Sequence, residues 1–467
     1  MQHVRNIAVV GSGPVGVITA IKLAKTLPSY VKIFLIDSGK IEVKLNLAAK
    51  LRKNSVNSRS IADSSLENME KINKEIAPSA LVGGYSNFWG GTWKVPAKYG
   101  LVYVNAFSEL EELLTEVAGS IGGTYYSTLV RDGGSFCRCM NSLLDEQWID
   151  TQIQIYESPL LLNEILDTSD HLKETITDYC AWNAITGLDY LKGFSNFNLL
   201  SDLWVEKFVE TPDGVTVHTP GGLLEFDIAV LACGPVETSR LLLRSVPNFN
   251  QILLSDTQMS YSLMIRWPRK KFKNSLGLSH VSSETCFDGP TSVELHTQYY
   301  AHLYDNKDIV LSRLPGLLRL PMSFMLRLFN PFLIVAINYI SSEVSGHLEV
   351  EKNRDNPNLI VISRTSSKIH RKTFSKIYKV LSKKLRHLGL LTSPWMVFHQ
   401  EPGKSFHYGA TRSKITDETG KVLGHKRCYA SGALSLPTIY PGPITSAAMS
   451  HGVLVANKII EEFFSTT

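Results

Sequence analysis

The fold is decided by Val4-Arg5-Asn6-Ile7-Ala8-Val9-Val10-Gly11-Ser12-Gly13-Pro14-Val15-Gly16, which is followed by an apolar helical pattern over residues 17–24. The β-branched run predicts a buried strand of a parallel sheet. In the Gly-x-Gly-x-x-Gly pattern, the three glycines supply a tight turn, a close backbone approach to a pyrophosphate and a close helix–strand contact. The amino end of the helix would hold the phosphates. The stretch therefore predicts a dinucleotide site.

The next predicted strand supports this interpretation because it ends in an acid. Lys32-Ile33-Phe34-Leu35-Ile36-Asp37 follows the helix, and Asp37 lies about twenty residues after the last glycine, where such folds bind a ribose hydroxyl. An ordinary strand-turn-helix connection is the alternative. The order of strand, glycines, helix and acid favours the nucleotide.

Length and composition exclude several classes of protein. The 467 residues suffice for two domains or one large interrupted domain, and 44% hydrophobic with 19% charged residues is typical of a globular chain. A net charge of +5 over this length predicts no nucleic-acid partner. The six cysteines form no Cys-x-x-Cys pair, so we expect neither a disulfide framework nor a metal site.

The beginning of the chain and its hydropathy predict a cytoplasmic protein. The glycine motif begins at Gly11, which leaves no room for the charged and apolar regions of a secretion signal. No uninterrupted apolar run reaches the roughly eighteen residues that a membrane span needs.

A second glycine-rich segment, residues 81–93, mixes glycines with aromatic residues. A turn with buried aromatic side chains is one interpretation. The other is a backbone that lies flush against a flat ring system, where a side chain would clash. Residues 40–80, which precede this segment, are polar and helix-forming, and we expect them to lie over the nucleotide.

The rest of the chain divides into two kinds of pattern. Short alternating strands over 195–227 lead into a buried strand over 228–235 and a helix over 237–243, a second strand-glycine-helix unit beside the first. Residues 256–365 are mostly strand-like and predict an antiparallel sheet. Helices are predicted over 107–117, over 369–388, which is basic and amphipathic, and over 446–463.

With these pieces, the sequence resembles the glucose-methanol-choline oxidoreductases, flavoenzymes that oxidise alcohols with FAD. The resemblance rests on residues 11–16 with Asp37, on 83–91, on 229–243, and on 407–412 with 429–438. It implies an α/β fold with a Rossmann-like FAD-binding domain, built on a parallel sheet with helices, over 1–100, 176–255 and 395–467. A substrate domain on a mostly antiparallel sheet would comprise 101–175 and 256–394.

The same resemblance implies where FAD would lie. Gly11, Gly13 and Gly16 would hold the pyrophosphate and Asp37 the adenosine ribose. The backbone of Val205 would meet the adenine edge, and residues 87–91 the flavin. Several relatives bond the flavin through a histidine, but Ser86-Asn87-Phe88-Trp89 contains none, so we expect non-covalent FAD. The predicted cofactor-binding residues are Gly11, Gly13, Pro14, Gly16, Asp37, Gly84, Ser86, Asn87, Trp89, Gly90, Gly91, Val205, Ala232, Gly234, Gly432 and Ala433.

His407 is the predicted catalytic base. Hydride removal from a carbinol carbon requires loss of the hydroxyl proton, and an imidazole is suited to accept it near neutral pH. His407 lies in a Gly/Thr-rich loop at the position that the family uses for its base; a surface or core histidine is the alternative. The family's second His or Asn has no counterpart in Pro441-Gly442-Pro443-Ile444-Thr445-Ser446, where we expect Thr445 or Ser446 to orient the substrate. Gly432 replaces a family aspartate.

Two segments have the composition of a membrane-surface contact. Residues 265–273 interleave aromatic and basic residues, and residues 314–329 are apolar with spaced arginines. A solvated loop and a core helix over the active site are the alternatives. Contact with the inner face of a membrane would suit a lipid-linked sugar or another amphiphilic alcohol as substrate and a quinone as electron acceptor.

The predicted function is oxidation of an alcohol group of a saccharide or biosynthetic intermediate, with oxygen or a quinone as electron acceptor. A flavin-dependent isomerase, reductase or dehydratase is a second hypothesis, motivated by the missing His or Asn. A non-catalytic membrane-associated protein of the same fold is a third.

Overall fold

The computed structural model describes residues 4–39, 81–87, 92–120, 151–157, 161–165, 179–266, 281–287, 293–300, 324, 333–353, 360–387, 390–412 and 414–465. Its centre is a five-stranded sheet in which all neighbouring strands are parallel. The strand order is β20 (Cys428–Ala430), β10 (Ile228–Leu231), β1 (Asn6–Val10), β2 (Lys32–Ile36) and β6 (Phe197–Leu200). The strands predicted at the beginning of the chain and over 228–235 are confirmed.

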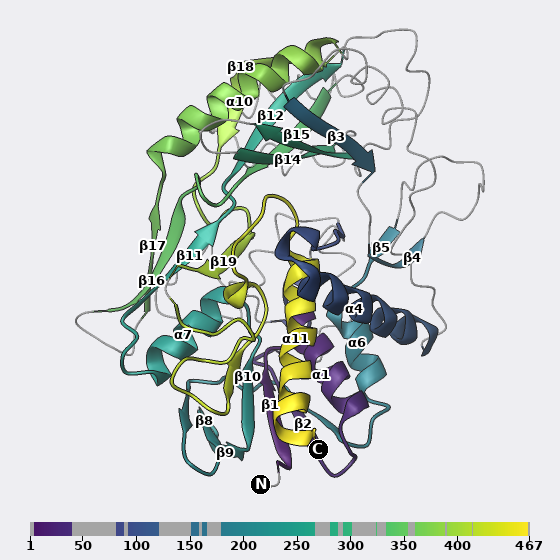
Figure 1. Ribbon diagram of the computed structural model, residues 1–467, viewed down its shortest axis with the longest axis vertical. Helices are drawn as coiled ribbons and strands as arrows, with labels where there is room; N and C mark the ends of the chain where they lie inside the picture. The colour runs from purple at the N-terminus through teal and green to yellow at the C-terminus, as the bar shows by residue number, and fades with distance from the viewer. Residues whose placement is uncertain are drawn as a thin grey trace.

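Alternate side chains of the parallel strands face two separate hydrophobic cores, as the period of two in a strand requires. Ile7 and Val9 of β1 belong to one core, which includes α1 (Pro14–Thr26) and α11 (Thr445–Phe464). Ala8 and Val10 belong to the other core, which includes α7 (Pro235–Ser245). Helices α4 (Leu101–Ser120) and α6 (Ala184–Leu191) extend the first layer, and α1 and α11 run side by side (Figure 1).

Two small antiparallel sheets flank this layer. Strands β7 (Lys207–Glu210), β8 (Val215–Thr219) and β9 (Gly222–Phe226) form the first sheet. The second has the order β17 (Ile360–Thr365), β16 (His347–Lys352), β11 (Gln251–Asp256) and β19 (Tyr408–Thr411). Because β19 follows His407 directly, the second sheet fixes where this histidine lies.

A six-stranded antiparallel sheet forms the upper half of Figure 1. Its order is β18 (Leu390–His399), β12 (Met259–Arg266), β15 (Leu333–Ile340), β14 (Val293–Tyr300), β13 (Val281–Phe287) and β3 (Thr151–Glu157). The predicted fold class, a parallel α/β layer with an antiparallel sheet domain, is therefore confirmed. A further pair joins β4 (Leu162–Ile165) and β5 (Tyr179–Ala181).

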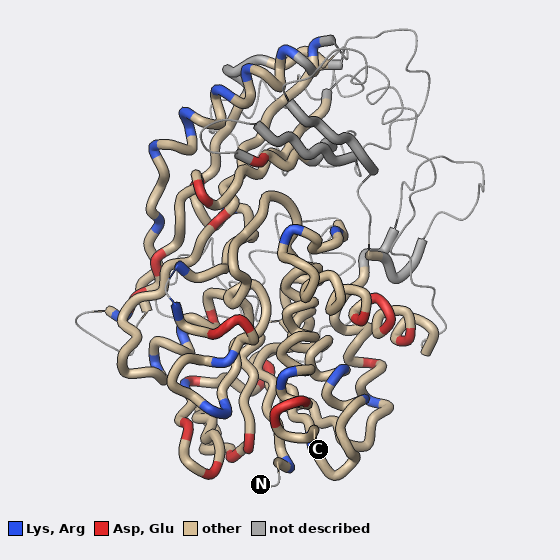
Figure 2. Tube along the Cα trace, in the orientation of Figure 1, with Lys and Arg blue, Asp and Glu red and all other residues tan. Residues whose placement is uncertain are grey.

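The basic helix α10 (Lys368–His387) covers part of the six-stranded sheet and packs on β18. Its inner side buries Phe374, Ile377, Tyr378 and Leu381. Its lysines and arginines recur along its length in Figure 2, and the helix contains no acid. The amphipathic helix predicted over 369–388 is confirmed.

The division into domains stays a prediction. Helix α4, which this division assigns to the substrate domain, packs against α11 and α6 of the parallel layer.

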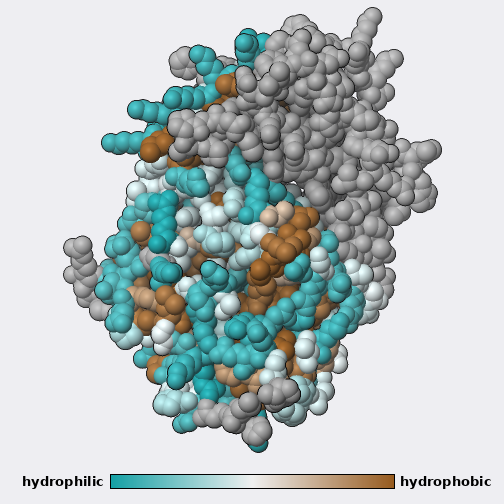
Figure 3. All heavy atoms as spheres, viewed as in Figure 1, coloured by the Kyte–Doolittle hydropathy of each residue, from teal (hydrophilic) through white to brown (hydrophobic). Residues whose placement is uncertain are grey.

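Figure 3 shows an apolar patch over the beginning of α4, where Leu101 and Val102 are exposed.

The segments predicted to contact a membrane lie almost entirely outside the described residues. Only Ile265 and Arg266 of the first and Phe324 of the second belong to them, and residues 40–80 also lie outside. Among the described helices, none is long and apolar enough to cross a bilayer.

Candidate cofactor and active site

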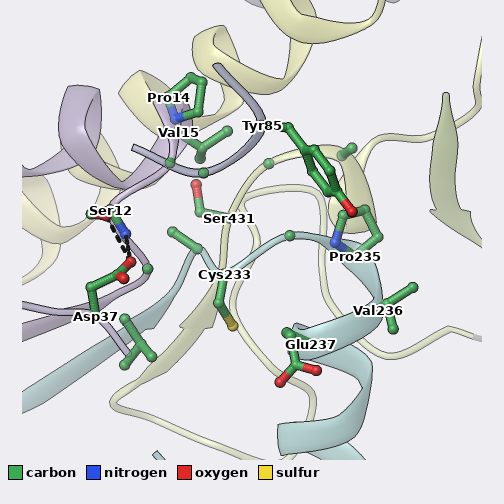
Figure 4. Close-up of a pocket in the computed structure, with 18 of the residues that line it drawn as sticks. Ser12, Pro14, Val15, Asp37, Tyr85, Cys233, Pro235, Val236, Glu237 and Ser431 are labelled. Atoms are coloured by element: carbon green, nitrogen blue, oxygen red, sulfur yellow. Dashed lines mark hydrogen bonds between the residues drawn. The ribbon is translucent and has the colours of Figure 1, made fainter. Parts of the chain in front are cut away.

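A deep cavity opens at the carboxyl ends of β1, β2 and β10 (Figure 4), the place where doubly wound sheets bind ligands. Its walls come from every block that the family resemblance identified. Of the predicted cofactor residues, it is lined by Gly11, Gly13, Pro14, Asp37, Gly84, Ser86, Val205, Ala232, Gly234, Gly432 and Ala433. Gly16 lies outside the lining. Trp89, Gly90, Gly91 and the side chain of Asn87 lie outside the described part of the chain.

The three glycines that follow β1 have different structural roles. Gly11 has φ +104°, and a Cβ there would stand 2.6 Å from the Cα of Cys233. A Cβ on Gly16 would stand 1.8 Å from the carbonyl oxygen of Gly11. A Cβ on Gly13 meets nothing within 4 Å. Gly11 and Gly16 therefore permit the strand, turn and helix to pack, whereas Gly13 opens the loop to the cavity.

Asp37 and Ser12 connect the loop after β1 with the segment at Gly83. One oxygen of Asp37, Oδ2, accepts hydrogen bonds from the backbone and hydroxyl of Ser12, both at 2.7 Å, and Oδ1 accepts one from Gly39 N at 2.7 Å. The Ser12 hydroxyl in turn accepts from Gly83 N at 2.9 Å. Burial raises the pKa of the Asp37 carboxyl, and the hydrogen bonds from Ser12 and Gly39 oppose this effect.

Ser86 has a structural part in the second glycine-rich segment. Its hydroxyl donates to Gly83 O at 2.6 Å and accepts from Ala184 N at 2.9 Å. The segment that reaches the cavity at Gly84 is thereby attached to the amino end of α6.

Two buried polar atoms in the cavity wall have no hydrogen-bond partner among the described residues. One is the hydroxyl of Ser431, which points toward the loop at Val15 in Figure 4. The other is Glu237 Oε1, whose companion Oε2 accepts from Arg240 Nε at 2.6 Å. A buried polar group without a partner is costly, so both atoms suit a ligand that carries phosphate oxygens and sugar or amine donors.

The predicted adenine contact at Val205 is held by Arg240. Its Nη2 donates to Val205 O at 2.7 Å and its Nη1 to Glu206 O at 3.2 Å. The guanidinium also lies over the ring of Trp204, 4.5 Å from its centroid, where cation–π attraction adds to the hydrogen bonds. The described residues therefore fit FAD: the Gly13 loop and Ser431 would face phosphates, and Asp37, Glu237 and the Val205 backbone the adenosine.

The backbone of His407 is held from two sides. Its N–H donates to Ser405 Oγ at 2.9 Å, and its carbonyl accepts from Thr257 N at 3.1 Å. Ser405 Oγ donates to Asp256 Oδ1 at 2.5 Å, and Gly403 N donates to Asp256 Oδ2 at 3.0 Å. The buried carboxylate of Asp256 thus orders the loop that presents His407.

This loop is strained beside the histidine, since Phe406 has φ +57°. Phe406 and Tyr408 line the cavity, but His407 between them does not. Such strain in a non-glycine residue is often found at functional sites.

The environment of His407 keeps its imidazole neutral. Burial, together with the nearby ring of His296, lowers the pKa of His407 to about 3. The side chain is partly exposed, but its Nδ1 is buried and has no hydrogen-bond partner among the described residues. Burial likewise raises the pKa of Asp256 to about 7, against the hydrogen bonds from Ser405 and Gly403. A neutral imidazole is the form that accepts a proton.

The two predicted substrate-orienting residues are separated. Thr445, the first residue of α11, lines the cavity. Ser446 is buried, and its hydroxyl donates to the Lys94 carbonyl.

Sequence reasoning missed Glu237, Ser431 and Asp256. The first-turn acid of α7 after Gly234-Pro235 was a usable signal for Glu237, whereas nothing local distinguishes Asp256 from a strand-end acid.

Comparison with known proteins extends this description. No family model and no curated protein matches the sequence. Among solved structures, pyridoxine 4-oxidase from Mesorbium loti superposes with a TM-score of 0.58 and 13% identity, over 97% of this chain and 98% of its own. The two chains share a fold. The likeness extends over the parallel layer and the antiparallel sheets together.

Proposed function

We propose that the protein is an FAD-dependent oxidoreductase that oxidises the CH–OH group of a small alcohol. The observation that carries the proposal is the position of His407, which lies in a strained loop between Phe406 and Tyr408, two residues that line the cavity. The fit of that cavity to FAD supports it, as does the fold shared with a protein named pyridoxine 4-oxidase.

When bound, FAD supplies the hydride acceptor for the carbinol carbon. His407 would accept the hydroxyl proton of the substrate on its neutral imidazole, so that the alkoxide character needed for hydride loss can develop. Asp256 and Ser405 hold the His407 backbone in place through the hydrogen bonds described above. Thr445, at the cavity wall, would contact the substrate or the cofactor.

The substrate class and the electron acceptor belong to the same proposal. A small alcohol, such as a saccharide or a biosynthetic intermediate, would be oxidised. The name of the structural neighbour, an oxidase, favours oxygen over a quinone as acceptor.

The test begins with the purified protein. We expect a yellow chromophore that acid precipitation releases into the supernatant, because the FAD is non-covalent. Under anaerobic conditions, one member of a panel of alcohols and sugars should bleach it. His407→Asn should keep the chromophore and slow bleaching by roughly a hundredfold or more, whereas the control His425→Asn should leave the rate unchanged. A colourless protein that takes up no added FAD would contradict the proposal.

A further inference from the structure

A second histidine approaches the site from the six-stranded sheet. His296 on β14 and Tyr339 on β15 are direct cross-strand partners, and their ring centroids are 6.2 Å apart. The Tyr339 ring also packs against His407, 4.7 Å between centroids at an interplanar angle of 32°. Three rings, from β14, β15 and the loop before β19, therefore form one cluster beside the cavity.

The loop before α11 is shaped around His296. Gly442 has φ +102°, and a Cβ on it would stand 2.9 Å from Cγ and 3.2 Å from Nδ1 of His296. The imidazole thus occupies the space that a side chain at residue 442 would need. Two residues further on, Ile444 lines the cavity, as does Thr445, so His296 lies beside the cavity wall.

The burial of His296 and Tyr339 strengthens the electrostatic effect of one imidazole on the other. Only 2% of His296 and 7% of Tyr339 is exposed, so little water separates the rings from one another. Two imidazoles in such a place disfavour each other's charge, and the presence of His296 indeed lowers the pKa of His407. The pair can hold one proton far more easily than two.

Two acidic residues and a tyrosine stand near His296 along its own strand and the two neighbouring strands. Glu294, two residues earlier on β14, is paired with Lys98 at 2.6 Å. Glu284 stands opposite His296 in the register with β13. Tyr339 is the cross-strand partner of His296 on β15 and packs against it.

We propose that His296 is a positioning residue of the active site, which acts with Tyr339 on His407 so that the two imidazoles are never protonated at the same time. This inference rests on the proposed alcohol oxidation. During that reaction the substrate O–H bond breaks, an N–H bond forms on His407, and the C–H electron pair leaves as hydride to bound FAD. His296 stays neutral, and its presence favours release of the proton from His407 after each turnover.

The first experiment measures the pair without substrate. Histidine labelled with ¹³C at Cε1 is incorporated into the FAD-loaded protein, and the His407 resonance, assigned by its loss in His407→Asn, is followed against pH. We expect His296→Phe to raise the pKa of His407 by about one unit, because the His296 imidazole is one of the causes that lower this pKa. The matched control is His370→Phe, which removes another fully buried histidine, one that packs against Phe374 and His399.

A second variant guards against misfolding of His296→Phe. Gly442→Ala places a methyl group against the His296 ring, and we expect it to shift the His407 titration in the same direction. An unchanged His407 titration in either folded variant would overturn the inference.

Kinetics supply the remaining readout. With the alcohol that bleaches the wild-type flavin, His296→Phe should lower kcat about tenfold or more, leave KM within a few-fold and move the acid limb of the kcat profile. Unchanged kcat with an unchanged acid limb would contradict the role of His296 and leave the oxidase proposal standing. A wild-type protein whose flavin no alcohol bleaches would defeat the oxidase proposal instead, while the titration would still decide whether the two histidines are coupled.

Discussion

The parallel layer and the six-stranded sheet contribute to the site in different ways. In the parallel layer, the groups that would hold the nucleotide stand at the ends of strands, in short loops such as Gly11–Ser12–Gly13 and at Asp37. In the six-stranded sheet, His296 and Tyr339 lie within strands and meet through register. Loop chemistry is a local property of the chain, whereas a constellation within a sheet depends on pairings between distant segments.

The sharpest test of the part of the site that the parallel layer contributes is a pair of glycine variants. Gly16→Ala puts a Cβ 1.8 Å from the Gly11 carbonyl oxygen, whereas Gly13→Ala meets no atom within 4 Å. We expect Gly16→Ala to lower the free energy of unfolding by roughly 3 kcal/mol or more and Gly13→Ala to fold normally but bind FAD less well. Thermal melting and flavin titration measure the two effects. Equal melting temperatures for the two variants would refute the conclusion that Gly16 is needed for packing and Gly13 is not.

Asp256, at the end of β11 in the four-stranded sheet, tests contacts between segments that are distant in the sequence. Asp256→Ala leaves Ser405 and Gly403 without their acceptor, so we expect a loss of roughly 2 to 3 kcal/mol in the free energy of unfolding and slower flavin reduction by substrate. The pKa of Asp256, raised to about 7, adds a pH signature. The folded state keeps a proton that the unfolded state releases, so this group's stabilisation is lost as pH rises toward and through 7.

The matched variant Asp256→Asn cannot ionise. Urea unfolding at pH 5 and pH 8 should therefore show a smaller decline in stability for Asp256→Asn than for the wild type. Equal declines would mean that Asp256 does not titrate in this range.

His451 of α11 holds the Gly432 turn within the parallel layer, and its stability contribution has the opposite pH dependence. Its Nδ1 accepts from Gly432 N at 3.2 Å, and burial lowers its pKa to about 4. The unfolded state therefore binds a proton first, and stability falls as pH drops below about 6.5, on the order of 2 kcal/mol by pH 5. Urea unfolding of His451→Gln against wild type, at pH 7 and pH 5, measures the contribution. If the stability of His451→Gln fell between pH 7 and pH 5 as much as that of the wild type, His451 would not be the source of the decline.

Glu237 gives the smallest expected effect. Glu237→Gln keeps the shape of the side chain but removes the charge of the unpartnered Oε1, and we expect FAD to bind about tenfold more weakly, the loss of one charged hydrogen bond. Equilibrium flavin titration measures this change. Asp189→Asn, on the exposed end of α6, serves as the control and should bind FAD as the wild type does.

Much of the fold and part of the site were predictable. Strands β1, β2, β6 and β10, helices α1, α7, α10 and α11, and strands β7 to β9 and β14 to β17 of the antiparallel sheets follow from periodicity and turn residues, whereas α6, β3, β18 and β20 were not predicted. Residues 11–16 and Asp37 were predicted together and lie together. The polar atoms of Glu237 and Ser431 were not predicted, because neither residue type nor spacing reveals which buried atom lacks a partner.

The sequence alone determined the loop after β1 and its contact with Asp37, because a glycine turn and a strand-end acid act through backbone geometry over a short stretch of chain. Only the tertiary structure decided which groups surround His407. His296, Tyr339 and Gly442 are far apart in the sequence, and their meeting depends on strand register and on one loop that has no side chain where the imidazole lies. Such contacts leave no periodic trace, since the packing of separate elements and not local conformation brings them together.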